Sequence, residues 1–297
     1  MKTDLAQALS SGRMTLSVEC LPPRGTDASA LRKLAGALPA RVDAVVVADN
    51  PQGNGGSALA CAAILAGEKV EPVLSVITRD RNRIALQSDI LGAASFGVRS
   101  VLCLSGEHQS LGADAQAAGV YDIDPVQLIL GLKAMCDKGA DFAGKPLESK
   151  PKLLLGAAAH PYLRPMPLNL WGLRKKVNAG AGFFVTQAVF DVAGFAEWMD
   201  AVRAAGIDKQ AAIIASVLPL TSVEQARQLQ EKQNSGVGPE VVQRMAGAAD
   251  AAKEGIAIAV EAARQLKALP GVRGIHILSG GPEAAAKIVE EAGLAQA

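Results

Sequence analysis

Eight short apolar runs, rich in valine, isoleucine and leucine, recur along the chain and constrain its fold more than any other feature. Each run is continuously apolar and does not alternate with polar residues, which is typical of strands buried on both faces of a parallel sheet. Segments with helical spacing of apolar residues separate the runs. The eight runs cover residues 14–20, 43–49, 71–77, 99–105, 152–159, 182–187, 211–218 and 273–280.

Helix start and stop signals lie between these runs. Asp124 stands before Pro125, and proline suits the first position of a helix that an aspartate caps. Glycines such as Gly97 close other helical patterns, as expected at helix C-termini. Helices are therefore predicted over residues 27–38, 82–97, 124–139, 170–182 and 239–269, the last as two pieces around Gly255.

Strands alternating with helices over 297 residues predict a (β/α)8 TIM barrel that forms a single domain over residues 1–297. A doubly wound open sheet is the alternative. However, the segment after the first run, "ECLPPRGTD", has one glycine and lacks the glycine-rich fingerprint of dinucleotide-binding sheets. The long irregular segment 106–124 is predicted to be a functional loop, because such loops are uncommon in compact domains.

Composition argues against several functional classes. The net charge is +1 and aromatic residues make up 3%, without a basic stripe, so we expect no nucleic-acid surface. No stretch approaches the roughly 20 apolar residues of a membrane span, and the N-terminus has no secretory pattern, so a cytoplasmic protein is expected. The widely spaced Cys20, Cys61, Cys103 and Cys136 suit free thiols, and no helix carries paired metal ligands.

Polar residues collect where the predicted strands end. In a (β/α)8 barrel these carboxyl ends share one rim, where the chemistry takes place. The predicted opposite ends show no comparable cluster. The side chains expected on the rim include two glutamates, an aspartate, two histidines, a glutamine and several arginines, namely Glu19, Asp49, Arg79, Arg81, Arg83, Glu107, His108, His160 and Gln187.

Several of these residues also have an ordinary structural interpretation. A glutamate at a strand end is more often solvated than catalytic, and His276, inside the last run, is interpreted as a core histidine with its hydrogen bonds satisfied. Gln187 is harder to explain in this way, because a buried amide needs partners for its donors and its acceptor.

The chain resembles the methylenetetrahydrofolate reductase family. The resemblance rests on "SVECLPPRG" (17–25), "KVNAGAGFFVTQAVFD" (176–191) and "SVLPLTS" (216–222), in the family's order. Segments within residues 79–129 are similar to the short single-domain reductases of acetogenic and one-carbon-metabolising bacteria. The resemblance extends over about residues 14–280 and is carried mainly by the first two segments together.

This resemblance implies a (β/α)8 barrel that reduces 5,10-methylenetetrahydrofolate to 5-methyltetrahydrofolate. It implies a flavin, usually FAD, across the strand ends, reduced by NADH or NADPH in a ping-pong cycle. Glu19 matches the acid that protonates N10, Glu107 matches a catalytic and pterin-binding aspartate, and Gln187 matches a pterin-binding glutamine. The positions expected to bind the flavin are Asp49, His160, Asn169, Lys175 and Lys176.

Two departures from the family pattern leave alternatives open. Glu107 replaces the usual aspartate, and Asn169 stands where many relatives have an acid. FMN could therefore replace FAD, or hydride could pass directly from a nicotinamide without flavin. The chain could also be a folate- and flavin-binding subunit that receives electrons from a partner protein. A homo-oligomer is expected in each case.

Overall fold

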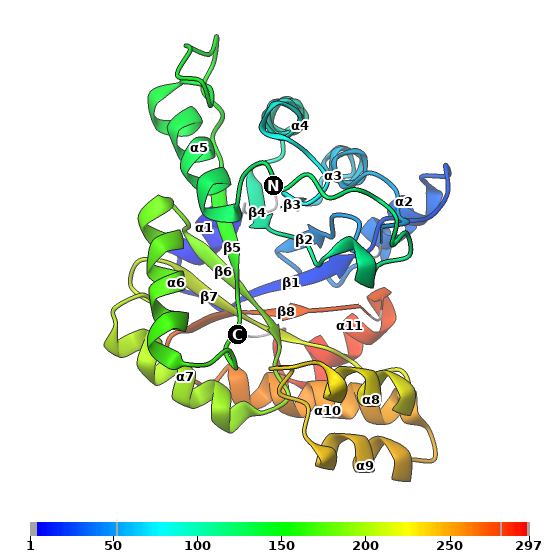
Figure 1. Ribbon diagram of the computed structural model, residues 1–297. Helices are drawn as coiled ribbons and strands as arrows, with labels where there is room; N and C mark the ends of the chain where they lie inside the picture. Colours follow the sequence, from blue (N-terminus) through cyan, green and yellow to red (C-terminus); the bar gives the residue numbers. More distant parts are fainter. Residues whose placement is uncertain (1–4, 52, 280, 296–297) are drawn as a thin grey trace.

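The computed structural model describes residues 5–51, 53–279 and 281–295, and its centre is a closed barrel of eight parallel strands (Figure 1). The strands pair in sequence order, and β8 pairs back onto β1. This confirms the (β/α)8 prediction and excludes the open sheet. The strands are β1 Thr15–Cys20, β2 Ala44–Val47, β3 Pro72–Ile77, β4 Ser100–Leu104, β5 Leu154–Ala159, β6 Phe183–Ala188, β7 Ala212–Val217 and β8 Val272–Ile277.

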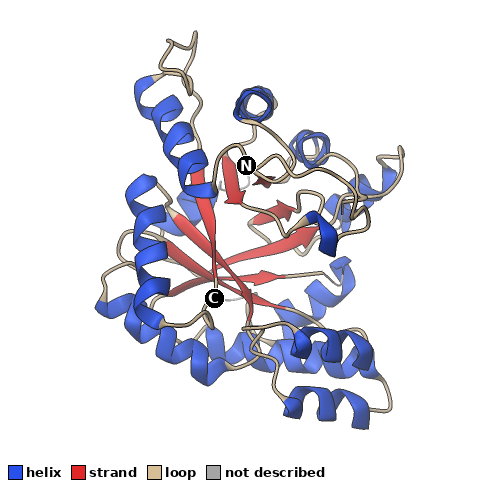
Figure 2. Cartoon of the chain, in the orientation of Figure 1, coloured by secondary structure: helices blue, strands red, loops and turns tan. Residues whose placement is uncertain are grey.

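Helices surround the barrel (Figure 2). The predicted capping of α5 is confirmed, because Asp124 and Gln127 form a reciprocal capping box with Pro125 in the first turn. None of the described helices is long and apolar enough to cross a membrane. The helices are α1 Leu5–Ser10, α2 Ser29–Ala37, α3 Ala58–Gly67, α4 Arg83–Ser95, α5 Pro125–Lys138, α6 Met166–Ala179, α7 Val192–Ala204, α8 Val223–Glu231, α9 Pro239–Gly247, α10 Ala251–Leu266 and α11 Gly281–Glu291.

The predicted break at Gly255 is wrong. Helix α9 ends at Gly247 and α10 begins at Ala251, so Gly255 lies inside α10. The glycine has a packing reason instead, because a Cβ atom there would lie 1.8 Å from the carbonyl oxygen of Leu220. Its missing side chain therefore lets α10 pack closely against the loop that follows β7.

Helix α1 packs against the amino-terminal end of the barrel. Its Leu5 and Leu9 are buried and share an apolar cluster with lumen residues such as Val46, Leu102 and Phe183. A second and larger apolar cluster fills the space between the strands and the surrounding helices. Because apolar side chains fill the amino-terminal end of the barrel, a cavity inside the barrel can form only at the carboxyl ends of the strands.

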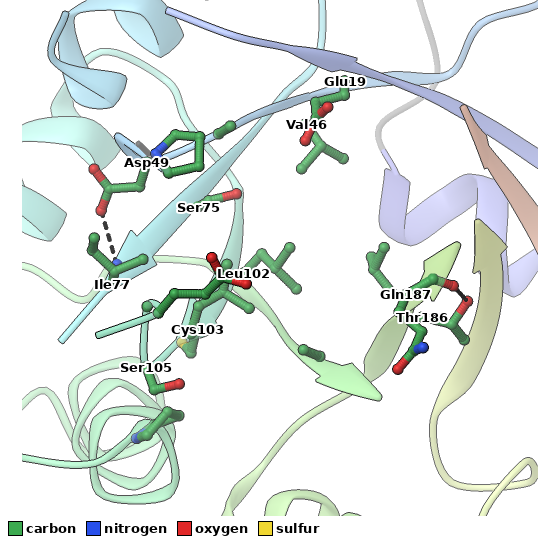
Figure 3. Close-up of a pocket in the computed structure, with 18 of the residues that line it drawn as sticks. Glu19, Val46, Asp49, Ser75, Ile77, Leu102, Cys103, Ser105, Thr186 and Gln187 are labelled. Carbon is green, nitrogen blue, oxygen red and sulfur yellow. Dashed lines mark hydrogen bonds between the residues drawn. The ribbon is translucent and has the colours of Figure 1, made fainter. Parts of the chain in front are cut away.

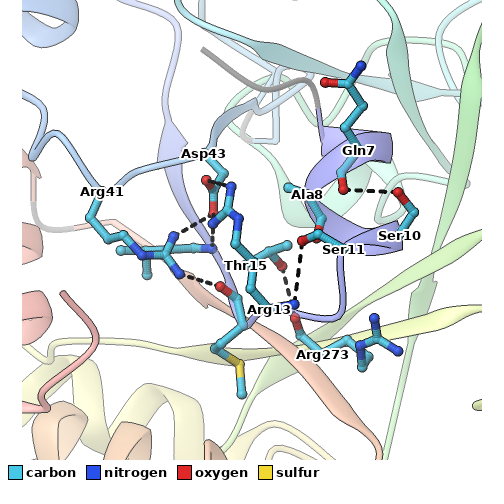
Figure 4. Close-up of polar contacts among 11 residues, drawn as sticks. Gln7, Ala8, Ser10, Ser11, Arg13, Thr15, Arg41, Asp43 and Arg273 are labelled. Carbon is cyan, nitrogen blue, oxygen red and sulfur yellow. Dashed lines mark hydrogen bonds and ion pairs between the residues drawn. The ribbon is translucent and has the colours of Figure 1, made fainter. Parts of the chain in front are cut away.

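The amino end of the barrel carries an ionic cluster around Asp43, which the sequence did not predict (Figure 4). The Asp43 carboxylate is 9% exposed and accepts hydrogen bonds from Arg13, from Arg41 and from the backbone N–H of Leu16. The Arg41 guanidinium also donates to the carbonyl of Met14. The cluster ties the start of β2 to the segment that enters β1, so its role is structural.

We predict that Gly255→Ala lowers the free energy of unfolding by about 1 to 3 kcal/mol, because the new methyl group would overlap the main chain at Leu220. Gly92→Ala in α4 is the matched control. A Cβ there meets nothing within 4 Å, so the better helix propensity of alanine should add about 0.5 to 1 kcal/mol. Urea unfolding measures both, and equal effects would contradict the packing account.

We also predict that Asp43→Ala destabilises the protein by about 2 to 4 kcal/mol, because it removes the carboxylate that accepts hydrogen bonds from two guanidinium groups and one backbone N–H. Asp200→Ala is the control, since Asp200 is 77% exposed in its pair with Arg203. That change should stay within about 0.5 kcal/mol in the same urea titration. A loss below 1 kcal/mol for Asp43→Ala would show that the cluster does not tie β1 to β2 as described.

Candidate active site

A cavity of about 380 Å³ opens at the carboxyl ends of the strands (Figure 3). This volume lies at the lower end of the range usual for small-molecule sites, about 300–1,000 Å³. Its lining is mainly apolar, with polar side chains converging from different strands. The residues predicted for the site that line this cavity are Glu19, Asp49, Glu107, His160, Lys176 and Gln187. Among the described residues, Asn169 and Lys175 lie outside the lining.

Glu19 stands at the end of β1, where closure of the barrel brings Ser279 from the end of β8. One Glu19 carboxylate oxygen accepts hydrogen bonds from the Ser279 backbone N–H, at 3.1 Å, and from its hydroxyl, at 3.0 Å. Burial raises the pKa of Glu19, while the two hydrogen bonds from Ser279 act in the opposite direction. The carboxyl group is therefore disposed to hold a proton at the cavity wall.

A β-bulge presents Gln187 to the cavity. Val185 of β6 pairs with Ile214 of β7, but the next registered pair is Ala188 with Ser216, so three steps on β6 oppose two on β7. The Thr186 hydroxyl accepts from the Ser216 N–H at 3.0 Å and so replaces a lost ladder bond. Bulges re-aim side chains, and here Thr186 and Gln187 both line the cavity.

Residues 232–238, between α8 and α9, form a segment that we call the strap. The carbonyl of Asn234 accepts a hydrogen bond from Gln187 Nε2, and Lys232 Nζ lies 3.5 Å from Glu107 Oε1. The sequence analysis missed the strap. The letters "KQNSGVG" signal only a turn, and nothing in them indicates which strand ends the segment will meet.

Glu107 lies on the loop after β4, and its side chain is exposed. Its backbone is held by the buried Arg79, which donates to the Glu107 carbonyl at 2.9 Å and to the Asn50 carbonyl at 3.2 Å. Arg79 also pairs with Asp80 at 2.7 Å. Arg79 therefore ties the loops after β2 and β4 together, while the carboxylate of Glu107 is left able to turn towards a ligand.

Three of the five predicted flavin-binding residues line the cavity. Lys176 donates to the carbonyl of Ala158 at 2.7 Å, and burial lowers its pKa. Withdrawal of the His160 ring from water lowers the pKa of His160, and the charge of Lys176 acts in the same direction. Asp49 accepts from the N–H of Ile77 at 2.8 Å and from the Arg81 guanidinium.

Asn169 and Lys175 face other partners. The Asn169 amide donates to the carbonyls of His160 and Leu163 at 2.7 and 3.0 Å, and its oxygen accepts from the indole of Trp198 at 3.2 Å. Asn169 thus holds the loop after β5. The exposed ammonium of Lys175 lies 4.1 Å from the centroid of the Trp171 ring. Neither side chain lines the cavity, so both would have to move to contact a cofactor bound there.

His276 is confirmed as a core histidine with a satisfied ring nitrogen. Its Nδ1 lies 3.0 Å from the Ser17 hydroxyl, and the ring is 1% exposed. Burial lowers its pKa to about 4, so the ring is neutral at neutral pH, and it forms part of the cavity lining. Among the described residues, no group of three or more histidine, cysteine, aspartate or glutamate side chains is placed to hold a metal ion.

We predict that Glu19→Gln stabilises the protein relative to the wild type as the pH rises above about 4.5. The folded protein holds the Glu19 proton more tightly than the unfolded chain does, so ionising this group costs the folded state stability. The advantage of the variant should grow through the raised folded pKa and then level off. Urea unfolding from pH 4 to 8 measures it, with the exposed Glu197→Gln as control. An advantage that is independent of pH would contradict the raised pKa.

Comparisons with known proteins bear on this site. A family model described as "Methylenetetrahydrofolate reductase" matches residues 4–293. The 5,10-methylenetetrahydrofolate reductase of Escherichia coli K12 is 28% identical over 157 residues, which are 53% of this chain and 47% of the relative. The enzyme of the same name from Pectobacterium carotovorum is 26% identical over 220 residues, 72% of this chain and 67% of the relative. The match to the Escherichia coli relative therefore spans about half of that relative's length.

The fold is also shared with a solved structure. An uncharacterized protein from Clostridium thermocellum, whose name says that it binds two copies of 5-methyl-5,6,7,8-tetrahydrofolic acid, superposes with a TM-score of 0.63 at 14% identity. The superposition covers 97% of each chain. Since the family model matches nearly the whole chain and the barrel is as expected, this protein belongs to the methylenetetrahydrofolate reductase family.

Proposed function

We propose that this protein reduces 5,10-methylenetetrahydrofolate to 5-methyltetrahydrofolate in the cavity at the strand ends. The observation that carries the proposal is a partly buried acid with a raised pKa, Glu19, which lines the same cavity as the amide of Gln187. Membership of the family and the names of the bacterial relatives support the same reaction.

Glu19 has the properties that ring opening of the substrate requires. The methylene carbon accepts hydride only as an iminium ion on N5, so N10 must take up a proton as it leaves. A carboxylic acid whose pKa is raised by burial keeps its proton to higher pH than a solvated one and can deliver it to N10. Once Glu19 is ionised, the N–H and hydroxyl of Ser279 stabilise its charge.

Gln187 and Glu107 are proposed to hold the pterin. The Gln187 amide donates one N–H to the Asn234 carbonyl, which leaves its second N–H and one lone pair of its oxygen for a ring edge that alternates N–H groups and lone pairs. The carboxylate of Glu107 can accept hydrogen bonds from the amino-pyrimidine edge. Lys232 already lies 3.5 Å from Glu107, and substrate binding would replace or share this weak exposed contact.

A flavin bound in the cavity would supply the hydride. His160, Lys176 and Asp49 are the residues proposed to hold it, since all three line the cavity. Lys175 lies against Trp171, outside the cavity lining, so it does not contact the phosphate end of a flavin unless it moves. Both FAD and FMN therefore stay candidates. NADH or NADPH is proposed as the electron source, with a separate electron-transfer protein as the alternative.

The visible spectrum of the purified protein, before and after adding FAD or FMN, tests whether flavin is used. Anaerobic mixing of the reduced protein with 5,10-methylenetetrahydrofolate should then reoxidise the flavin and yield 5-methyltetrahydrofolate. A protein that binds no flavin but converts the substrate with NADH or NADPH alone would support direct hydride transfer. A protein that NADH and NADPH cannot reduce, but dithionite can, would support the alternative with a separate electron-transfer partner.

We predict that Glu19→Gln slows folate reduction by about 100- to 10,000-fold, the usual contribution of a positioned acid, while nicotinamide oxidation stays near the wild-type rate. Stopped-flow absorbance of each half-reaction, measured separately under anaerobic conditions, provides the comparison. Glu197→Gln, on the outside of α7, is the control and should leave both half-reactions unchanged. An equal loss of both half-reactions in Glu19→Gln would argue against a role as proton donor.

A further inference from the structure

Three groups from separate elements form a hydrogen-bonded chain at the cavity mouth. The Asn234 carbonyl on the strap accepts from Gln187 Nε2 at 2.5 Å, and Gln187 Oε1 lies 3.3 Å from His160 Nδ1. Gln187 belongs to β6 and His160 follows β5, so the chain links two strand ends to the strap. Both side chains line the cavity.

The Asn234 carbonyl determines which groups donate and which accept in this series of hydrogen bonds. A backbone carbonyl can only accept hydrogen bonds, so the nitrogen end of the Gln187 amide must face Asn234. The oxygen end then faces His160, and a carbonyl oxygen there requires a donor. His160 must therefore carry its hydrogen on Nδ1.

The other ring nitrogen of His160 is then left with a lone pair. Partial burial of the ring and the nearby positive charge of Lys176 both lower the pKa of His160 from its ordinary value of 6.5, which favours the neutral ring at neutral pH. Lys176, on α6, is the charged group identified as facing this ring. A neutral ring with hydrogen on Nδ1 presents Nε2 as an acceptor.

The strap packs closely against the ring of Tyr162, which fixes its position. A Cβ atom at Gly236 would lie 2.3 Å from the ring of Tyr162, so the strap backbone rests directly on that ring. The Tyr162 hydroxyl in turn donates to the carbonyl of Asp191 at 2.8 Å. Asn234 itself has φ 58°, a left-handed conformation that asparagine tolerates and glycine adopts freely.

We propose that the strap carbonyl of Asn234 fixes the Gln187 amide, and through it the hydrogen on His160 Nδ1, so that His160 Nε2 accepts a hydrogen bond from a ring N–H of the bound heterocycle. The ligand class is a heterocycle with a lactam-type N–H, which pterins and flavins both possess. Only the identity of that ring rests on the proposed function. The orientation of Gln187 and the position of the hydrogen on His160 do not depend on any activity.

Nitrogen-15 NMR of the histidine rings tests the first half of the proposal. The chain has three histidines, so the His160 signals are those that disappear in His160→Gln. At pH 7.5 we expect the pattern of a neutral ring with hydrogen on Nδ1, although free imidazole side chains prefer hydrogen on Nε2. A wild-type ring with hydrogen on Nε2, or a protonated ring, would overturn the proposal.

Variants of the chain of hydrogen bonds sharpen this test. Gln187→Leu removes the acceptor and should move the hydrogen of His160 to Nε2. Asn234→Gly keeps the carbonyl and the left-handed backbone. Lys232→Ala alters the same strap but none of the groups in the series of hydrogen bonds. Both variants should therefore retain hydrogen on Nδ1 of His160. A switch to Nε2 in Lys232→Ala, or its absence in Gln187→Leu, would contradict the proposal.

Ligand titrations test the second half. His160→Leu should weaken binding of the accepting ligand roughly two- to tenfold, the usual effect of one neutral hydrogen bond. His160→Gln can place an oxygen where Nε2 stood and should restore most of the affinity. Separate titrations with 5-methyltetrahydrofolate and with FMN show which ring donates the N–H. If neither affinity changes in His160→Leu, the acceptor role is refuted, whatever the outcome for the reductase activity.

Discussion

The pairing of β1 with β8 is the interaction on which the site depends, because it closes the barrel and brings Ser279 to Glu19. An open sheet would leave Glu19 as a solvated strand end with an ordinary pKa. In the closed barrel the same carboxyl group is partly buried, which raises its pKa, and the two hydrogen bonds from Ser279 stabilise its charged form. Closure of the barrel therefore sets the pKa of Glu19.

Two buried polar residues hold the loops around the cavity in place. Arg79 joins the loops after β2 and β4, and Asn169 joins the loop after β5 to α6 and α7. Each is buried with its polar atoms engaged, which holds the loops in fixed positions at the cavity rim. Such support lets Glu107, on an otherwise exposed loop, stay near the site with a side chain that can adapt to a ligand.

Features encoded by local periodicity could be predicted from the sequence, and features that depend on distant contacts could not. The buried strands and the N-cap at Asp124 are local, and the structure confirms them. The predicted helix break at Gly255 was wrong, because this position requires glycine for close packing against the carbonyl of Leu220, which is distant in the sequence. Glu19 and Gln187 were predicted from their positions at strand ends, and the resemblance supplied their roles. The environment that raises the pKa of Glu19 and the bulge that turns Gln187 inward depend on neighbouring strands. The strap gives no local signal of its contacts at all.

The central claim is that the folded barrel makes Glu19 an acid of raised pKa, and carbon-13 NMR of the glutamate carboxyl groups tests it most directly. Comparison with Glu19→Gln assigns the signal. The account predicts a titration midpoint above the ordinary value of 4.5, rising further in Ser279→Ala because that variant removes the hydroxyl hydrogen bond that favours the ionised form. A midpoint at or below 4.5 in the wild type would contradict the account.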